Sequence, residues 1–169
     1  SGTITYNGED IWGEKYDRRT LRSEVGLVFQ YPEHQLLEND VLSDVCFGPM
    51  NQGLSREEAE VEAKKALQHV GFKEKNYSKS PFELSGGQKK RVAIAGVLAM
   101  NPKILILDEA TSSIDTHTEE MIKQALDVIL EGRTSFVIAH RLSTIRKADC
   151  IFYVADRTVA EAGTHEQLM

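Results

Sequence analysis

Residues 83–91 have the sequence ELSGGQKKR, residues 104–109 have the sequence ILILDE, and these two stretches decide the fold class. A serine and two glycines that open an apolar helix offer a hydroxyl group and unobstructed backbone N–H groups to an anion, at the positive end of the helix dipole. An apolar run that ends in two carboxylates is typical of a buried parallel strand, whose acids can serve a metal ion and a water molecule. Together they predict phosphate chemistry on an α/β fold.

Further apolar runs have the length of β-strands and alternate with helical patterns. They lie at 25–29, 135–139 and 151–154, and the run at 104–107 quoted above is the fourth. The order strand, helix, strand, helix after residue 100 indicates a parallel sheet, in which strands are buried on both faces. Right-handed crossovers then place Gln30, Glu109 and His140 at one carboxyl edge of the sheet, where such sheets bind ligands.

The segment between the first two strands has helical periodicity. A helix from residue 40 is expected to end at Gly48-Pro49, and a second opens with Ser55 and Glu58 at capping-box spacing. Another helix after residue 116 is expected to bury Ile122, Ala125, Leu126 and Ile129. We therefore divide the chain into an α/β core, residues 1–31 and 101–169, and a helical subdomain, residues 32–100.

These stretches resemble the ATPase subunits of ATP-binding cassette (ABC) transporters, which carry an LSGGQ signature and a Walker B strand of four apolar residues followed by Asp-Glu. The resemblance extends to Gln30, which is similar to the Q-loop glutamine, to residues 112–115, which are similar to the D-loop, and to His140, which is similar to the switch histidine. It covers essentially the whole chain. It implies a P-loop NTPase-like (RecA-like) parallel sheet with an inserted helical subdomain.

The resemblance implies roles for the residues that handle the reaction. Asp108 supports Mg²⁺, Glu109 polarises the attacking water as general base, and Gln30 touches Mg²⁺ or that water. His140 bridges Glu109 and the γ-phosphate, because an imidazole can donate from one nitrogen while a neighbour orients the other. ATP and Mg²⁺ are therefore the implied cofactors of an ABC-type ATPase.

The signature residues Ser85, Gly86, Gly87 and Gln88 contact, in this family, the γ-phosphate held by the facing subunit, and Asp115 lies along that junction. A plain helix N-cap would explain the serine but not the two glycines. The implied partners are a second ATPase subunit, in a homo- or heterodimer, and transmembrane transporter subunits that dock on the helical subdomain.

One family motif is absent, the loop G-x-x-x-x-G-K-[ST] that cradles the β and γ phosphates. In the family it precedes the segment that residues 1–8 resemble, so we expect a truncated domain that binds ATP weakly or not at all and is inactive alone. The strand before that loop lies between the Walker B strand and the histidine strand. Its loss would leave backbone groups unsatisfied, at about 1–3 kcal/mol each, so we expect a rearranged sheet or strand exchange in a dimer.

The resemblance also changes along the chain. Residues 28–36 and 81–88 are similar to energy-coupling-factor importer ATPases, whereas residues 108–115 and 138–144 look like ABC exporter ATPases. A chimera with a junction near Glu109 is one explanation, and an unusual natural member is the other.

Composition narrows the location and the partners. A net charge of −6 argues against a nucleic-acid surface, and no stretch has the roughly 18 uncharged apolar residues of a membrane span. The basic cluster at residues 89–91 is expected to be mainly a solvated helix face. Cys46 and Cys150 lack CxxC spacing and are expected to be reduced and mostly buried. We expect a cytoplasmic protein that reaches the membrane through partner subunits.

Two other functions stay open at this point. A non-catalytic or engineered cassette fragment is a serious alternative because the phosphate loop is absent. An ABC-type ATPase of DNA repair is less favoured, because the segment between Gln30 and Leu84 lacks the sustained heptads of coiled-coil arms.

Overall fold

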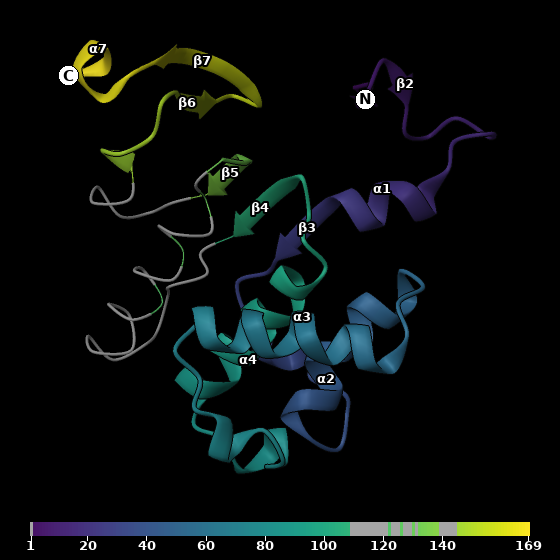
Figure 1. Cartoon of the computed structure of the whole chain (residues 1–169). Helices are drawn as coiled ribbons and strands as arrows, with labels where there is room; N and C mark the ends of the chain where they lie inside the picture. Colours follow the sequence, from purple (N-terminus) through teal and green to yellow (C-terminus); the bar gives the residue numbers. More distant parts are fainter. Residues whose placement is uncertain (1, 109–121, 123–125, 127–129, 131, 139–144) are drawn as a thin grey trace. The chain divides into compact units, whose positions relative to one another are not determined.

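The computed structural model of the chain describes residues 2–108, 122, 126, 130, 132–138 and 145–169 (Figure 1). The contacts within the chain define two compact units, residues 1–136 and 137–169. Among the described residues, no helix combines the length and the apolar character that crossing a bilayer requires.

A parallel pair of strands forms the centre of the first unit. β3 (Val25–Val28) and β4 (Ile104–Asp108) pair in parallel with Val25 opposite Ile104 and Val28 opposite Leu107. One face, which carries Gly26, Val28, Leu105 and Leu107, is buried, whereas Leu27 on the other face is 37% exposed. The expected burial of both faces is therefore wrong for these strands.

β5 (Thr134–Ile138) lies next to β4 in the same sheet, which has the order β3-β4-β5. Direct pairing of the Walker B strand with the strand that precedes His140 is one of the arrangements by which the sheet was expected to close. Strand exchange with a second chain stays a prediction.

The strand at 151–154 does not follow the parallel prediction. β6 (Ile151–Ala155) pairs antiparallel with β7 (Thr158–Gly163) in a two-stranded sheet of the second unit. The reason is the two-residue turn between them, where Asp156 and Arg157 have φ of 49° and 63°. Positive φ at both central positions gives the turn whose twist matches that of an antiparallel hairpin.

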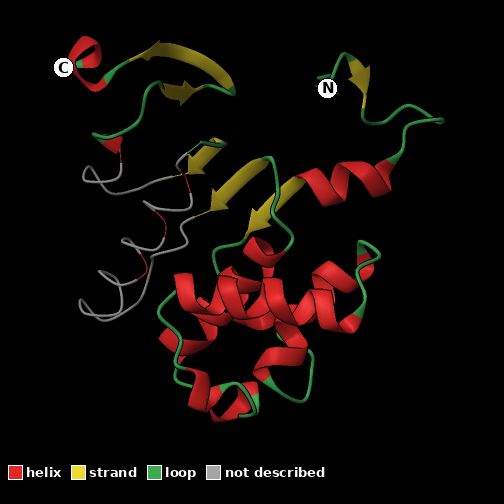
Figure 2. Cartoon of the chain, viewed as in Figure 1, coloured by secondary structure: helices red, strands yellow, loops and turns green. Residues whose placement is uncertain are grey.

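Helices gather on one side of β3 and β4 (Figure 2). The longer ones are α2 (Val41–Asn51), α3 (Arg56–His69) and α4 (Gly86–Ala99). The shorter elements are β1 (Thr5–Tyr6), β2 (Glu9–Asp10), α1 (Arg18–Glu24), η1 (Pro32–Gln35), η2 (Glu74–Asn76), η3 (Pro81–Glu83) and α7 (His165–Leu168).

A local signal accounts for the start of α3. Ser55 and Glu58 form the expected capping box, with the Ser55 N–H donating to Glu58 Oε2 at 2.8 Å. The expected break at Gly48-Pro49 is wrong, since α2 continues to Asn51 with Pro49 inside it. Pro49 removes one backbone N–H donor from the helix, but only two helical residues follow it, so little of the helix lies beyond the lost bond.

The helices share one apolar core. Its members on α2, α3 and α4 include Val45, Cys46, Leu67, Val92 and Ile94, each at most 1% exposed. Ile122 and Leu126 belong to the same core, as expected, whereas Ala125 and Ile129 lie outside the described residues. Burial raises the pKa of the Cys46 thiol. Cys150 is exposed, against the expectation of two mostly buried cysteines.

Candidate functional site

Gln30 and Asp108 lie at neighbouring strand ends. Asp108 is the last residue of β4, and Gln30 follows β3 by two residues. The parallel register, with Val28 opposite Leu107, brings both ends to the same carboxyl edge of the sheet, and both residues are half-buried. A carboxylate and an amide oxygen at one edge are ligands of the kind that Mg²⁺ accepts, alongside water and phosphate oxygens.

The signature residues form the first turn of α4. Ser85 is its N-cap: Ser85 Oγ accepts from the Gln88 N–H at 3.3 Å, and Gln88 Oε1 accepts from the Ser85 N–H at 3.0 Å. Both side chains thus satisfy backbone groups of the helix start. A Cβ added at Gly86 would have no heavy atom within 4 Å, so the backbone there is open to an approaching ligand.

The basic cluster after the signature departs from the expected solvated face. Lys90 is only 3% exposed, and its Nζ lies 5.9 Å from the centroid of the Tyr31 ring. Tyr31 directly follows Gln30 in the chain. The residues after the signature and the residues after the strand-end glutamine are therefore in contact, a relation that no spacing in the sequence indicated.

The remaining expected site residues, Glu109, Asp115 and His140, lie outside the described residues. Within the part of the chain that the structure describes, the strand ends bring Gln30 and Asp108 together, and the Lys90 contact joins the Gln30 segment to the signature helix.

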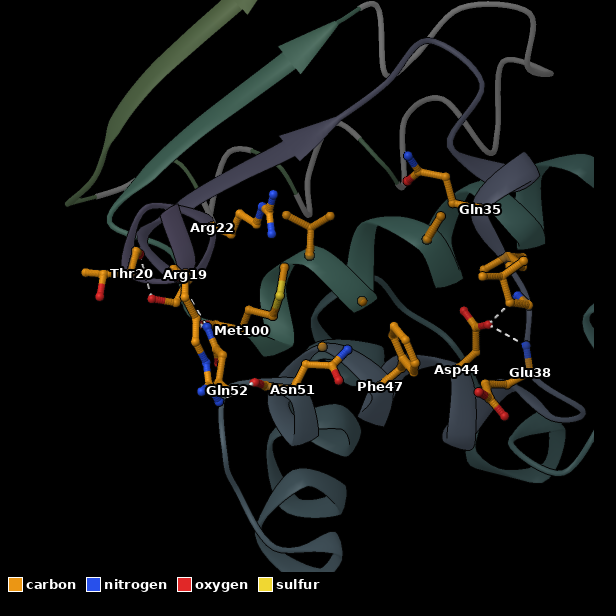
Figure 3. Close-up of a pocket in the computed structure, with 17 residues that line it drawn as sticks. Arg19, Thr20, Arg22, Gln35, Glu38, Asp44, Phe47, Asn51, Gln52 and Met100 are labelled. Atoms are coloured by element: carbon orange, nitrogen blue, oxygen red, sulfur yellow. Dashed lines mark hydrogen bonds between the residues drawn. The ribbon is translucent and has the colours of Figure 1, made fainter. Parts of the chain in front are cut away.

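A groove of about 670 Å³ lies in the first unit between α1, the segment after η1, α2 and α4 (Figure 3). The basic and the acidic side chains that line the groove lie at different ends of it. Arg19 and Arg22 of α1 lie toward one end, Glu38 and Asp44 toward the other, with Phe47 between (Figure 3). Phe47 is 53% exposed, so an aromatic ring is available to a partner. The sequence predicted docking on the helical subdomain but carries no motif for this groove.

Hydrogen bonds hold the groove walls in place. Asp44 Oδ1 accepts from the N–H groups of Leu37 and Glu38 at 2.7 and 2.9 Å, which fixes the segment after η1 against α2. Gln52 Nε2 donates to the carbonyl oxygens of Ser23 and Met100 at 3.2 and 3.1 Å. The two hydrogen bonds of Gln52 join the ends of α1, α2 and α4. The walls of the groove are therefore held together by specific contacts.

Comparison with known proteins gives a consistent result. A protein family described as ABC transporter matches residues 1–112. The chain is similar to the energy-coupling factor transporter ATP-binding protein EcfA2 of Listeria monocytogenes, with 47% identity over 172 residues, 99% of this chain and 60% of that protein. It is also similar to EcfA2 of Bacillus subtilis, with 46% identity over 148 residues, 88% of this chain and 52% of that protein.

A solved structure, that of a bacterial Atm1-family ABC exporter with ATP bound, is similar at 36% identity with a TM-score of 0.74. The similarity covers 99% of this chain and 29% of that chain. The chain spans 52–60% of the length of the two curated relatives.

Proposed function

The chain belongs to the ABC transporter family, and from this premise we propose that it is part of the ATP-binding, ATP-hydrolysing subunit that powers a membrane transporter. The observation that carries the proposal is the placement of Gln30 and Asp108 at adjacent carboxyl ends of β3 and β4. The similarity to energy-coupling factor ATP-binding proteins supports a transporter of that kind.

Asp108 and Gln30 would hold Mg²⁺ at this edge, and Glu109 would take the proton of the attacking water as general base. When bound, Mg²⁺ neutralises the charge that develops on the phosphate oxygens. His140 would orient Glu109 and donate to the γ-phosphate. The open backbone at Gly86, with Ser85, Gly87 and Gln88, would serve the γ-phosphate of the facing subunit, with Asp115 along the same junction.

We propose further that the groove beside α2 receives a segment of the transmembrane subunits, which would hold this protein at the cytoplasmic face of the membrane. Its exposed Phe47 offers an apolar anchor, and the separated charges fix the orientation of a charged partner segment. A second ATPase subunit would face the signature turn.

Because the sequence lacks the phosphate loop, we predict a specific outcome for ATP binding and hydrolysis. Calorimetric titration of the chain alone with ATP and Mg²⁺ should give no micromolar binding and no hydrolysis. Mixed with a facing ATPase subunit that has this loop, the chain should supply the signature residues and restore hydrolysis in a dimer seen by size-exclusion chromatography. Hydrolysis by the isolated chain that Glu109→Gln abolishes would overturn the predicted inactivity.

A matched pair of variants tests the signature role. Ser85→Arg should abolish the restored hydrolysis, because it blocks the turn, whereas Lys65→Ala on the exposed side of α3 should leave it unchanged. The two alternatives give different results: a non-catalytic fragment would restore nothing in any mixture, and a DNA-repair ATPase would respond to DNA. Between Gln30 and Leu84 the longest helix is α3, of 14 residues, which does not resemble a coiled-coil arm.

A further inference from the structure

Lys90 is a charged side chain placed where a charge is disfavoured. It is 3% exposed and lies in the second turn of α4, close to the end of the helix where the dipole is positive. Burial removes hydration from an ammonium group, and the dipole repels it further. Specific neighbours must therefore stabilise Lys90, since packing alone would favour an apolar side chain at this position.

Tyr31 is one of these neighbours. The Lys90 Nζ lies 5.9 Å from the centroid of its ring, within the range of a cation–π interaction, which strengthens when the cation is desolvated. The Tyr31 ring also stacks on the ring of His34, with centroids 5.9 Å apart and planes 20° apart. Two contacts thus set the orientation of one aromatic ring directly after Gln30.

The backbone around Tyr31 is also packed against α4. Pro32 is less than 2% exposed, and η1, which begins at Pro32, packs on the signature helix. The His34 N–H donates to the Tyr31 carbonyl oxygen at 3.2 Å and closes the first turn of η1. The segment that leaves the strand end is therefore attached to α4 by an apolar contact and by a charged one.

We propose that Lys90 is a positioning residue which, through the Tyr31 ring, fixes the Gln30 segment to the signature helix so that the two move as one unit. This inference rests on the proposed function, in which Gln30 serves the Mg²⁺ of its own subunit and Ser85 the γ-phosphate of the facing one. The contact then links the two nucleotide sites of a dimer. Lys90 itself touches no substrate in the proposed arrangement.

Hydrogen exchange tests the contact without relying on activity. Lys90→Met and Tyr31→Leu each keep an apolar side chain but remove the cation or the ring. Each should speed amide exchange over residues 31–37 by roughly 2- to 30-fold, the range set by the strength of a cation–π contact, with exchange in α3 unchanged. Lys90→Arg and Tyr31→Phe should exchange as slowly as the parent protein, since both keep a cation facing a ring.

A double-mutant cycle decides between a specific contact and general packing. The combined Lys90→Met and Tyr31→Leu variant should exchange no faster over 31–37 than the single variants, because each already removes the same interaction. Effects that simply add would overturn the proposal. So would unchanged exchange in both single variants.

The assembled transporter gives a second measurement. Lys90→Met should lower the kcat for ATP hydrolysis about 3- to 30-fold, while KM for ATP changes less than about twofold because Lys90 does not bind nucleotide. A rise in KM with kcat unchanged would overturn the positioning role. If the parent assembly hydrolyses no ATP, the proposed function fails, whereas the exchange cycle still decides whether the contact exists.

Discussion

Glu24 and Lys103 are joined twice, once through the backbone and once through their side chains. The Lys103 N–H donates to the Glu24 carbonyl oxygen at 2.8 Å, and the Lys103 ammonium forms an ion pair with the Glu24 carboxylate. Both residues come immediately before the first paired residues of β3 and β4, Val25 and Ile104. The double link therefore sets the register that brings Gln30 and Asp108 to one edge.

This link predicts a loss of stability in acid. The Lys103 hydrogen bond, followed by that of the Tyr6 hydroxyl, holds the pKa of Glu24 below its ordinary value. Because the folded pKa is depressed, the contribution of Glu24 is complete above the unfolded pKa of about 4.3. It is lost as the pH falls through the lower folded value. Denaturant unfolding between pH 7 and pH 3 should show a weaker acid dependence in Glu24→Gln.

Variants of the two residues that hydrogen-bond to Glu24 serve as controls for that experiment. Lys103→Gln should raise the pKa of Glu24 more than Tyr6→Phe does, since the lysine makes the larger contribution. Carboxyl titration by NMR measures both. Identical acid dependence in the parent and in Glu24→Gln would show that the link is not a determinant of stability.

Gln52 is expected to stabilise the groove through its two hydrogen bonds to the carbonyl oxygens of Ser23 and Met100. Gln52→Ala should lower the free energy of unfolding by about 1–3 kcal/mol, at 0.5–1.5 kcal/mol for each bond. Thermal and denaturant unfolding measure the change. Gln68→Ala, at an exposed position of α3, should stay within about 0.5 kcal/mol of the parent. Equal effects of the two variants would contradict the role of Gln52.

Two glycines of the first unit should respond differently to alanine. A Cβ at Gly26 would lie 2.7 Å from Val97 Cγ1 and 2.8 Å from Pro102 Cγ, so Gly26→Ala should cost about 1–3 kcal/mol of unfolding free energy. Gly86→Ala meets open space in the first turn of a helix and should change stability by less than about 1 kcal/mol. It should nevertheless reduce hydrolysis in the mixed dimer, because the methyl group occupies the space proposed for the phosphate. Unimpaired hydrolysis would argue against the proposed signature contact.

We expect that a substitution of Phe47 in the groove affects assembly but not folding. Phe47→Ala should weaken co-purification with the proposed transmembrane subunits about tenfold or more, as expected for an aromatic anchor worth at least 1.4 kcal/mol. Phe82→Ala removes a ring that is 82% exposed and does not line the groove, so it should leave assembly unchanged. Equal co-purification of both variants with the parent would place the docking surface elsewhere.

Local signals predicted a large part of the first unit. The Ser55 capping box and a parallel sheet that contains the strands at 25–28 and 104–107 are observed. These features depend on residues close in sequence or on the burial of an apolar run, so the pattern alone contains the information. The roles of Glu109, Asp115 and His140, and the chimeric origin, stay predictions.

The motifs, the family resemblance and the strand ends that carry Gln30 and Asp108 could all be predicted from the sequence. Three features appear only in the folded chain: Lys90 is buried, β6 turns back on β7, and a groove lies between α1, α2 and α4. Distant segments of the chain determine which face of a helix is exposed to solvent. They also determine which strand pairs with which, so neither can be predicted from local sequence. In the sequence Lys90 looks like part of a solvated cluster, whereas in the fold its ammonium lies near the Tyr31 ring and η1 packs on α4.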